Sequence, residues 1–359
     1  MTFAIHQFLP TWEPGAIGTH ALALHETCIE AGIECTTWAS EIKPGLAAVA
    51  RLADEFFVDR APRRGSVLLY HCAVGAPLGD QLLERSEPLV LNHHNVTPPI
   101  FFDAWHPAMA ENLEVGEAQV AKLARHCRFG IADSTFNAQQ LQHFGCSITE
   151  VATVFMNLEK PVSSALESRL RSGAAGTKWL FVGRIAPNKA QHELVRAFAW
   201  YRQAYDPAAQ LWLVGEGPAD GYTASLTRLI DHLGVADGIV MAGSVSEQDL
   251  GAYYAVADVF VSLSAHEGFG VPLVEAMAAR VPVVALAAAA VAETVGDAAV
   301  LVDRCDPGLV AGCVARVMRD AVVRDALIVA GDRRALQFSR SNTAQRWVQV
   351  LQQVRATLP

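Results

Sequence analysis

Residues 262–280 read Ser-Leu-Ser-Ala-His-Glu-Gly-Phe-Gly-Val-Pro-Leu-Val-Glu-Ala-Met-Ala-Ala-Arg and follow an apolar strand predicted over residues 258–263. The strand leads into a turn that contains Gly268 and Gly270. Pro272 then stands where a helix begins, because the N–H that proline lacks is one that a helix start leaves unpaired anyway. A strand, a glycine turn and a helix start present bare backbone N–H groups, and this arrangement predicts an anion-binding site.

Two carboxylates flank this turn. Glu267 stands before it, and Glu275 lies one turn into the predicted helix. Glycines alone are equally typical of a turn that only needs close packing. A buried carboxylate, in contrast, is costly without a partner, so a purely structural turn gains nothing from two of them. We therefore expect both carboxylates to face one cleft, with a phosphate able to lie between them.

The composition indicates a chain with large cores and no affinity for nucleic acid. The 359 residues suit two domains, and 52% of them are hydrophobic. The formal net charge is -9 without any basic block, so we expect no nucleic-acid partner. Seven cysteines without a Cys-x-x-Cys pair are typical of reduced thiols in a cytoplasmic protein. The first residues lack the basic region of a signal peptide, which also favours a cytoplasmic location.

Predicted strands and helices alternate along the chain in two series. A segment rich in serine and glycine, residues 157–177, separates the series and is the expected linker. This pattern predicts an α/β protein with two doubly wound domains, residues 1–156 and 178–340, that face one another across a ligand-binding cleft. The last helix, within residues 341–359, is expected to pack back toward the first domain.

The first strand of the chain is predicted over residues 3–8. A loop with glycines at Gly15 and Gly18 follows, and the first helix is expected over residues 20–31. In an open parallel sheet such a loop lies at the carboxyl edge, where ligands bind. The spacing lacks the third glycine of the dinucleotide fingerprint, so a hydride-transfer cofactor is not indicated.

Three histidines lie at the carboxyl ends of predicted strands. His71 ends a strand at residues 67–71, while His93 and His94 follow a strand at residues 88–92. A metal site, a substrate contact by one histidine, and capping or core hydrogen bonds are all open interpretations. Adjacent side chains on an extended chain point to opposite faces, which argues against a metal shared by His93 and His94. No Asp-x-Asp pair ends a strand, so we expect no metal.

These features together resemble glycosyltransferase family 4, the retaining group 1 glycosyltransferases of the GT-B fold, which has two facing Rossmann-like domains. Three motifs carry the resemblance: Glu267-x7-Glu275, Gly183-Arg184 followed by Lys189, and the glycine loop from Gly15 to Gly18. Four further segments resemble a bacterial carbohydrate-assembly subgroup: residues 70–71, 94–102, 132–137 and 287–296. The resemblance covers nearly the whole chain and is more specific in its C-terminal half.

The resemblance implies that residues 178–340 bind a nucleoside-diphosphate sugar. Arg184 and Lys189 would hold the diphosphate and stabilise the charge that the leaving group gains. The backbone from Gly268 through Phe269 to Gly270 would donate to the distal phosphate or to the sugar.

The remaining implied contacts involve the sugar, the ribose and the base. Glu267 would contact hydroxyls of the transferred sugar, and Glu275 would accept both ribose hydroxyls. Val245 would lie near the base, while His94 would reach the donor sugar and Gly18 the donor from the N-terminal domain. The implied catalytic set is therefore His94 and Glu267 together with the two cations at positions 184 and 189.

The implied reaction is hexosyl transfer with retention, from a nucleoside-diphosphate sugar to a saccharide or lipid-linked saccharide acceptor in polysaccharide biosynthesis. No metal or additional cofactor is implied. A nucleotide-sugar epimerase, a phosphorylase-like enzyme and a non-catalytic subunit that binds nucleotide sugars are the alternatives on the same fold. A phosphorylase would need a lysine for pyridoxal phosphate, but Lys189 lies in the predicted phosphate loop.

The distribution of charge bears on membrane binding. Residues 1–155 contain 9 Lys and Arg and 17 Asp and Glu, a net charge of -8, whereas the rest of the chain carries -1. The local basic cluster of this half, Arg60, Arg63 and Arg64, stands beside acidic residues at positions 54–59. Each basic residue at an anionic surface contributes about 1 kcal/mol, and neighbouring acids offset that attraction. We therefore expect no strong intrinsic binding to membranes, which leaves a lipid-linked acceptor compatible with the sequence.

Overall fold

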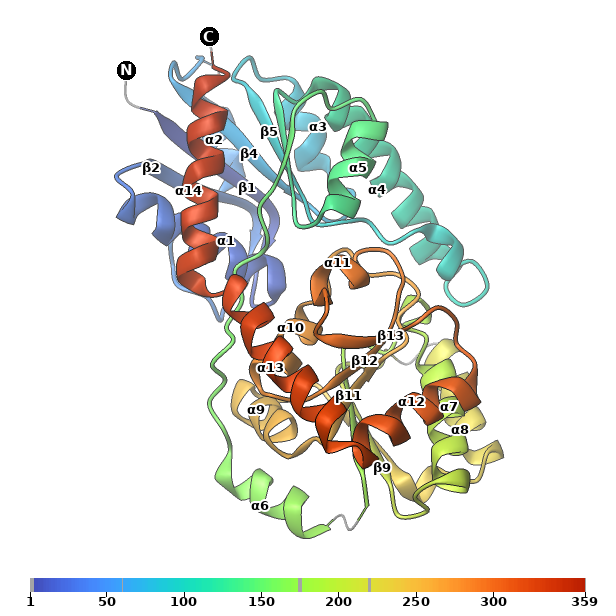
Figure 1. The fold of residues 1–359 in the computed structure, drawn as a ribbon. Helices are drawn as coiled ribbons and strands as arrows, with labels where there is room; N and C mark the ends of the chain where they lie inside the picture. The colour runs from blue at the N-terminus through green and yellow to red at the C-terminus, as the bar shows by residue number, and fades with distance from the viewer. Residues whose placement is uncertain (1–2, 60, 174–175, 219–220, 359) are drawn as a thin grey trace. The chain divides into compact units, whose positions relative to one another are not determined.

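The chain forms two compact units in a computed structural model that describes residues 3–59, 61–173, 176–218 and 221–358 (Figure 1). The first unit comprises Met1–Ile100, Ala108–Met156 and Phe338–Pro359. The second comprises Phe101–Pro107 and Asn157–Gln337. The short segment Phe101–Pro107 thus groups with the second unit, although it lies within the first half of the sequence.

The first unit is built on a parallel sheet of seven strands in the order β3-β2-β1-β4-β5-β6-β7. Its strands are β1 (Ala4–Trp12), β2 (Glu34–Ile42), β3 (Ala50–Leu52), β4 (Ser66–Cys72), β5 (Leu89–His93), β6 (Phe129–Ala132) and β7 (Thr149–Val151). Its helices are α1 (Ala16–Glu30), α2 (Ala53–Val58), α3 (Pro77–Leu83), α4 (Pro107–His126), α5 (Thr135–His143) and α14 (Arg340–Ala356), and a short 3-10 turn, η1, covers Pro99–Phe101.

The second unit is built on a parallel sheet of six strands in the order β10-β9-β8-β11-β12-β13. Its strands are β8 (Lys178–Val182), β9 (Gln210–Val214), β10 (Ile239–Gly243), β11 (Val259–Ser262), β12 (Val283–Leu286) and β13 (Ala299–Val302). Its helices are α6 (Ser164–Gly173), α7 (Gln191–Ala204), α8 (Gly221–His232), α9 (Glu247–Val256), α10 (Val271–Ala278), α11 (Val291–Val295), α12 (Pro307–Arg319) and α13 (Ala321–Gln337), with 3-10 turns η2 (Pro187–Lys189) and η3 (Ala236–Gly238).

The strand order places a topological switch point in each sheet. In the first unit the chain runs outward on one side from β1 and then returns to add β4 on the other side. In the second unit β8 and β11 have the same relationship. Ligands of doubly wound sheets bind outside the carboxyl ends of the strands at such points. We therefore expect ligands at the loops that follow β1 and β4, and at those that follow β8 and β11.

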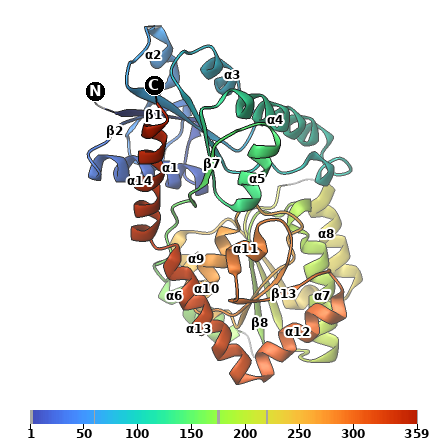
Figure 2. The ribbon, with the colours of Figure 1, turned by 45° about the horizontal axis from the view of Figure 1, so that its top comes forward.

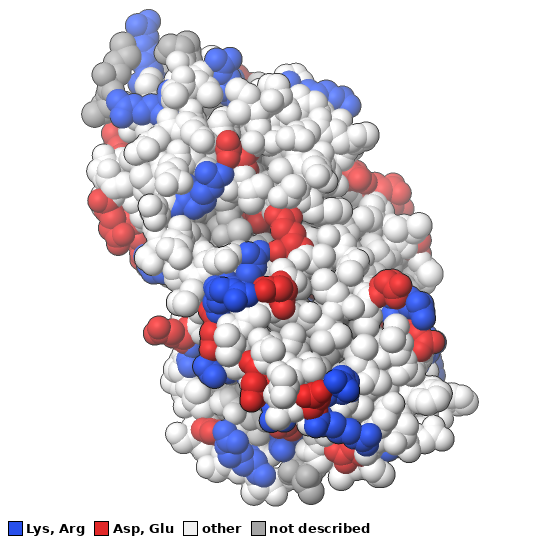
Figure 3. Space-filling view, in the orientation of Figure 1, with Lys and Arg blue, Asp and Glu red and all other residues white. Residues whose placement is uncertain are grey.

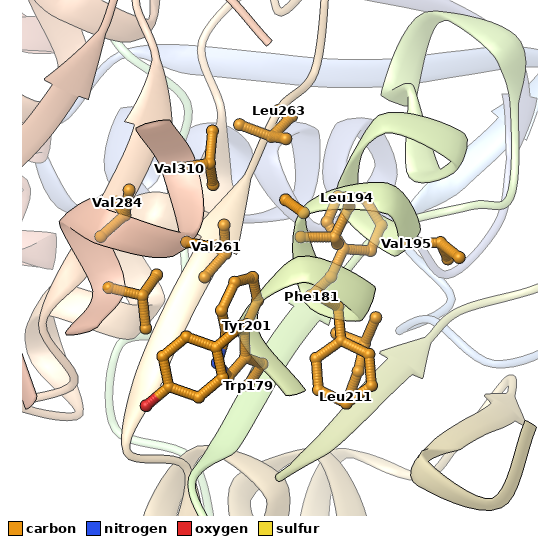
Figure 4. Close-up of a cluster of buried hydrophobic side chains, with 14 of the residues drawn as sticks. Trp179, Phe181, Leu194, Val195, Tyr201, Leu211, Val261, Leu263, Val284 and Val310 are labelled. Carbon is orange, nitrogen blue, oxygen red and sulfur yellow. The ribbon is translucent and has the colours of Figure 1, made fainter. Parts of the chain in front are cut away.

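The core of the second unit rigidly supports its switch point. Trp179 and Phe181 of β8 and Val261 of β11 are at most 1% exposed and pack in one cluster with side chains of α7 (Figure 4). Leu194 of α7 is also buried at the centre of this cluster. Burying aliphatic and aromatic side chains contributes about 1.5–3 kcal/mol each relative to exposure. The strands that lead to the switch point are thus fixed by packing on the helix that follows it.

The first strand and first helix differ from the prediction. Strand β1 runs to Trp12 and includes Pro10, where a loop was expected. Pairing with β4 ends at Phe8, so the proline, which has no N–H to donate, lies beyond that part of the ladder. Helix α1 begins at Ala16, and Gly18 is therefore a buried helical residue rather than part of a loop. A Cβ at Gly18 would lie 1.9 Å from the carbonyl oxygen of Glu13, so close backbone approach explains this glycine.

The expected linker is partly helical, since α6 (Ser164–Gly173) lies within residues 157–177, of which residues 174–175 fall outside the described part. At the other end, α14 (Arg340–Ala356) belongs to the first unit and contacts α1, as both ribbon views show (Figures 1 and 2). Trp347 of this helix is fully buried, and its indole N–H donates to the carbonyl of Thr153. The last helix is thus a structural part of the first unit.

No helix among the described residues is long and apolar enough to cross a bilayer. On the face drawn in Figure 3, Lys and Arg side chains are interspersed with Asp and Glu. Of the basic cluster noted in the sequence, Arg60 lies outside the described residues. The guanidinium of Arg63 lies over the ring of Phe56, 4.2 Å from its centroid, so this side chain also serves packing.

Candidate active site

Two loops meet at the switch point of the second sheet. One follows β8 and contains η2 (Pro187–Lys189), and the other connects β11 to α10. The backbone N–H of Ala265 donates to the carbonyl of Asn188 at 2.9 Å, which joins the loops directly. Residues that are about 80 positions apart in the sequence therefore share one small region at the carboxyl edge of the sheet.

Lys189 and Glu267 form an ion pair across these loops. The Nζ atom of Lys189 lies 2.7 Å from Oε1 and 2.8 Å from Oε2 of Glu267. Both side chains are mostly buried, with 21% and 14% of their surfaces exposed. A charge-assisted contact of this length is among the stronger hydrogen bonds in proteins. The cation and the carboxylate predicted as site residues are therefore brought together and neutralise one another.

The glycine turn before α10 has a fixed conformation. Gly270 caps the helix with φ of +93°, a value that residues with a side chain rarely adopt. Phe269 is buried, and its carbonyl accepts a hydrogen bond from the hydroxyl of Thr294. Helix α10 begins at Val271, one residue before the predicted start, so Pro272 is its second residue. The turn from Gly268 to Gly270 thus directs the positive end of α10 toward the switch point.

Glu275 is buried, and two partners satisfy its carboxylate. Its Oε1 lies 2.9 Å from Nζ of Lys160, and its Oε2 accepts a hydrogen bond of 2.9 Å from the hydroxyl of Tyr254. Burial, followed by the charge of Glu275, raises the pKa of Tyr254 well above its ordinary value, so this hydroxyl stays a donor. We expected both carboxylates to face one cleft, and in the structure Glu267 and Glu275 each have their own lysine partner.

Lys160 connects Glu275 to a second carboxylate, with its Nζ 3.0 Å from Oε2 of Glu247. Burial lowers the pKa of Lys160, but the charge of Glu275 and the hydrogen bonds to both carboxylates outweigh that effect and raise it. The lysine is therefore charged at neutral pH. It lies in the segment expected to be a mere linker, and it is a site residue that sequence reasoning missed.

Arg184 follows β8 and is exposed. Its side chain has no ion pair among the residues that the structure describes, whereas its carbonyl accepts a 2.8 Å hydrogen bond from the amide of Gln191. The amide oxygen of Gln191 accepts from the hydroxyl of Tyr222 at 3.2 Å, which orients it. Gln191 thus fixes the backbone of the arginine loop. Val245 is half-buried and follows β10, which is two strands away from β8 in the sheet.

In the first unit the switch point is lined by histidines. His71 of β4 and His94, which follows β5, lie in hydrogen-bond contact, and His20 of α1 joins them. His93 points to the other side and its Nε2 contacts Oε1 of Gln140 at 2.7 Å, as expected for neighbours on an extended chain. Both ring nitrogens of His94 are engaged by protein partners, His71 and Asp133. Gly18 contributes backbone packing nearby.

Several residues that complete these sites carry no local signal in the sequence. They are Lys160, Gln191, Tyr222 and Tyr254 in the second unit, and Gln7, His20 and Asn92 in the first. Each acts through a partner that is near in space but, for most of them, distant in sequence. Only the topology of the sheets brings them together.

Residues 176–320 match the family model described as glycosyl transferases group 1. The matched region contains β8, η2 and the whole Lys189–Glu267 site. The predicted similarity to group 1 glycosyltransferases is confirmed for these residues, while membership of family 4 stays a prediction.

Curated relatives extend the similarity. The chain is 30% identical over 263 residues to the D-inositol 3-phosphate glycosyltransferase of Thermobispora bispora, covering 68% of this chain and 60% of that protein. It is 35% identical over 175 residues to the GDP-mannose-dependent alpha-(1-6)-phosphatidylinositol monomannoside mannosyltransferase of Mycobacterium tuberculosis, covering 46% and 43%. The chain spans 36% to 60% of the length of the first curated relatives that it matches.

The fold is shared with solved structures across nearly the whole chain. HepE of Anabaena, crystallised in complex with UDP and glucose, superimposes with a TM-score of 0.75 at 19% identity, covering 97% of this chain and 99% of that one. The two Rossmann-like parallel sheets are those of the GT-B fold, so the predicted fold class is confirmed.

Proposed function

We propose that this protein is a glycosyltransferase that moves a sugar from a nucleoside-diphosphate sugar to a saccharide or lipid-linked saccharide acceptor. The Lys189–Glu267 pair at the β8–β11 switch point carries the proposal, since it places a cation and a carboxylate beside the N-terminus of α10. The cation and the N-terminus of the helix can bind a diphosphate, and the carboxylate can accept hydrogen bonds from sugar hydroxyls. Two similar proteins support the proposal: one is named as GDP-mannose-dependent, and HepE was crystallised with UDP and glucose.

The roles of the site residues follow from their chemistry. Lys189 and the exposed Arg184 hold the diphosphate, and the backbone from Gly268 through Phe269 to Gly270 donates to it. As the diphosphate leaves it gains negative charge, which fixed cations and helix dipoles stabilise without reorganisation. Glu267 then binds hydroxyls of the transferred sugar once Lys189 turns to the phosphate.

The binding of the nucleoside is assigned to two further positions. Glu275, held in place by Lys160 and Tyr254, accepts the ribose hydroxyls, and Val245 lies near the base. Lys160 and Tyr254 each contact one oxygen of Glu275, so both oxygens keep a lone pair for a ligand. In the first unit, His94 is assigned a contact with the donor sugar and Gly18 a contact with the donor.

The proposal includes retention of the anomeric configuration and hexosyl transfer in polysaccharide assembly. It also includes transfer without metal or further cofactor, because lysine and arginine can take the neutralising role that a divalent ion would have. We place the protein in the cytoplasm without strong intrinsic membrane binding, given the acidic first half and the acids beside Arg63 and Arg64.

The strongest rival functions are an epimerase and a non-catalytic subunit that binds nucleotide sugars. Incubating the protein with a panel of UDP-, GDP-, ADP- and TDP-sugars, with and without saccharide acceptors, separates them. We expect release of nucleoside diphosphate that requires an acceptor and persists after chelation of metals. Conversion of the donor sugar without release would identify an epimerase, and binding without any turnover would identify a subunit. Either result would contradict the proposal.

A further inference from the structure

A pair of buried histidines lies at the switch point of the first sheet. Nδ1 of His71 is 3.0 Å from Nε2 of His94, and the two rings are parallel within 3°. Two ring nitrogens at this distance need a proton between them, because two lone pairs repel one another. Which ring supplies the proton depends on the partners of the other two nitrogens.

Gln7 determines the tautomer of His71. The amide nitrogen of Gln7 donates to the carbonyl of Ala21 at 3.0 Å, and a carbonyl can only accept. The amide oxygen of Gln7 is therefore the atom that faces Nε2 of His71, at 3.1 Å. Since this oxygen also only accepts, the Nε2 of His71 carries a hydrogen. In a neutral ring the Nδ1 of His71 is then a bare lone pair.

Asp133 determines the tautomer of His94. Its carboxylate oxygens lie 2.9 and 3.1 Å from Nδ1 of His94, and both side chains are at most 5% exposed. A carboxylate only accepts, so the Nδ1 of His94 carries a hydrogen. A neutral His94 would consequently present a second lone pair to His71. If both rings were neutral, the contact between Nδ1 of His71 and Nε2 of His94 would have no hydrogen in it.

A metal ion is the other species that could join two lone pairs. His20, His71 and His94 are the one group of three close ligand atoms that the described residues form. However, the backbone N–H of Phe155 donates to Nδ1 of His20 at 3.1 Å. A neutral His20 therefore carries its hydrogen on Nε2, the atom that would have to bind the metal. Metal-bound histidines show the opposite pattern, with the outer nitrogen donating.

We propose that the His71–His94 pair holds one proton more than two neutral rings, so that His94 is an imidazolium ion paired with Asp133. Its Nε2–H donates to His71, and its Nδ1–H donates to the carboxylate. The structure thereby assigns a buried positive charge to the carboxyl edge of the first sheet.

The surroundings of the pair agree with the location of this proton. Burial, and then the charge of His94, lowers the pKa of both His71 and His20 well below the ordinary value, so those rings stay neutral. Asp133 is the anion that contacts His94, whereas His93 points away to Gln140. The amide nitrogen of Asn92 lies 3.2 Å from Nδ1 of His71 and can donate to the lone pair assigned there.

One consequence rests on the proposed transfer reaction. An imidazolium has no lone pair, so His94 cannot remove a proton from an acceptor hydroxyl, and its contribution is positive charge.

Nuclear magnetic resonance of the full chain labelled with ¹⁵N-histidine tests the assignment without any substrate. At pH 7.5 we expect one buried ring with both nitrogens protonated, and this signal should vanish in His94→Gln and persist in the control His93→Gln. Asp133→Asn should convert it to a neutral ring. Neutral signals from every buried histidine of the wild-type protein would overturn the proposal, whether or not any variant folds.

Metal analysis gives a second readout. The proposal expects less than about 0.1 zinc per chain after purification without chelators, with no change in His71→Gln. Stoichiometric metal that is lost in His71→Gln would overturn the proton assignment. Since neither measurement uses a sugar donor, absence of transferase activity would contradict the proposed function and leave the proton assignment to be judged on its own.

Discussion

Lys189 and Glu267 face each other across the β8–β11 switch point, with the lysine nitrogen within 2.8 Å of both carboxylate oxygens. The pair gives the site a preformed geometry and no net charge. An ammonium has three N–H donors, so one is left for a phosphate while two face the carboxylate, and a phosphate that takes more than one must displace Glu267. In the proposed roles, this displacement frees Glu267 for the sugar.

Removing the cation tests its role in binding. We expect Lys189→Ala to weaken binding of the cognate nucleoside diphosphate by about 1–3 kcal/mol, since a charge-assisted hydrogen bond is lost. Calorimetric titration measures the change. Lys178→Ala is the matched control. Lys178 is the first residue of β8, the strand that precedes Lys189, and its ion pair with Asp258 is long, at 3.8 Å. Equal affinities of folded Lys189→Ala and wild-type protein would exclude this contact.

The two carboxylates should separate by function. Glu267→Gln is expected to retain most nucleotide affinity and to lose most transfer, because Glu267 contacts the sugar. Glu275→Gln should instead weaken nucleotide binding, since it removes the charge that holds ribose hydroxyls and Lys160. Titration and initial-rate measurements on both variants decide the matter. The reverse pattern would show that the roles are exchanged.

Tyr254 positions Glu275 through one hydrogen bond. We expect Tyr254→Phe to lower stability by about 1 kcal/mol and to weaken nucleotide binding by a similar amount, roughly fivefold. Tyr253→Phe is the control, because the described structure records no hydrogen bond for the hydroxyl of Tyr253. Thermal unfolding and titration give the two quantities. A tyrosine whose loss leaves binding intact would be structural only.

Gly215 allows the chain to turn after β9. It has φ of +143°, and a Cβ there would lie 2.2 Å from the carbonyl oxygen of Gly183. Gly215→Ala combines backbone strain with a steric clash and should cost at least about 2 kcal/mol, or a fall in Tm of about 4–8 °C. Gly173→Ala, at a position with open space around it, should be nearly neutral. Equal Tm values for the two variants would refute the clash.

Acid should destabilise the first unit through His6. The indole N–H of Trp38 donates to Nδ1 of His6 at 3.2 Å, which requires a neutral ring. Burial, and then the charge of Arg63, lowers its pKa to about 4. Below pH 6.5 the unfolded chain binds more protons than the folded one, so stability falls between pH 6.5 and about 4 by up to roughly 3 kcal/mol.

Denaturant unfolding at pH 7.5 and 5.0 measures this loss. His6→Phe should show a smaller difference between the two pH values than wild-type protein, while the exposed His126→Gln should match wild type. A His6→Phe variant with an undiminished difference would assign the acid sensitivity elsewhere, with buried His93 as the next candidate.

The strand–helix alternation was sufficient to predict both sheets, because parallel buried strands read as short apolar runs between turn residues. Ser134 caps α5, as its hydroxyl accepts from the N–H of Asn137. The extension of β1 through Pro10 was not predictable. Beyond Phe8 the strand pairs with β2 and no longer with β4, and this tertiary arrangement is what tolerates a residue without an N–H. Helix α6 also lies in a segment whose composition indicates a linker.

For the site, the motif residues were predicted from their spacing and from the resemblance to a family, whereas their partners were not predicted. Lys160 reaches Glu275 over 115 positions, and no local pattern distinguishes it from a solvated lysine. Gln7 and His71 are likewise 64 positions apart and meet because β1 and β4 are neighbours in the sheet. Spacing within a motif is local information, but charge neutralisation and tautomer choice depend on tertiary contacts.

We propose above all that the second unit binds a nucleoside diphosphate at the Lys189–Glu267 pair. Calorimetric titration of the full chain with UDP, GDP, ADP and TDP tests it most directly. We predict that at least one of the four binds with one site per chain, and that Lys189→Ala weakens its binding by roughly five- to 150-fold while Lys178→Ala does not. Folded protein that binds none of the four, or that binds one equally well without Lys189, would contradict the claim.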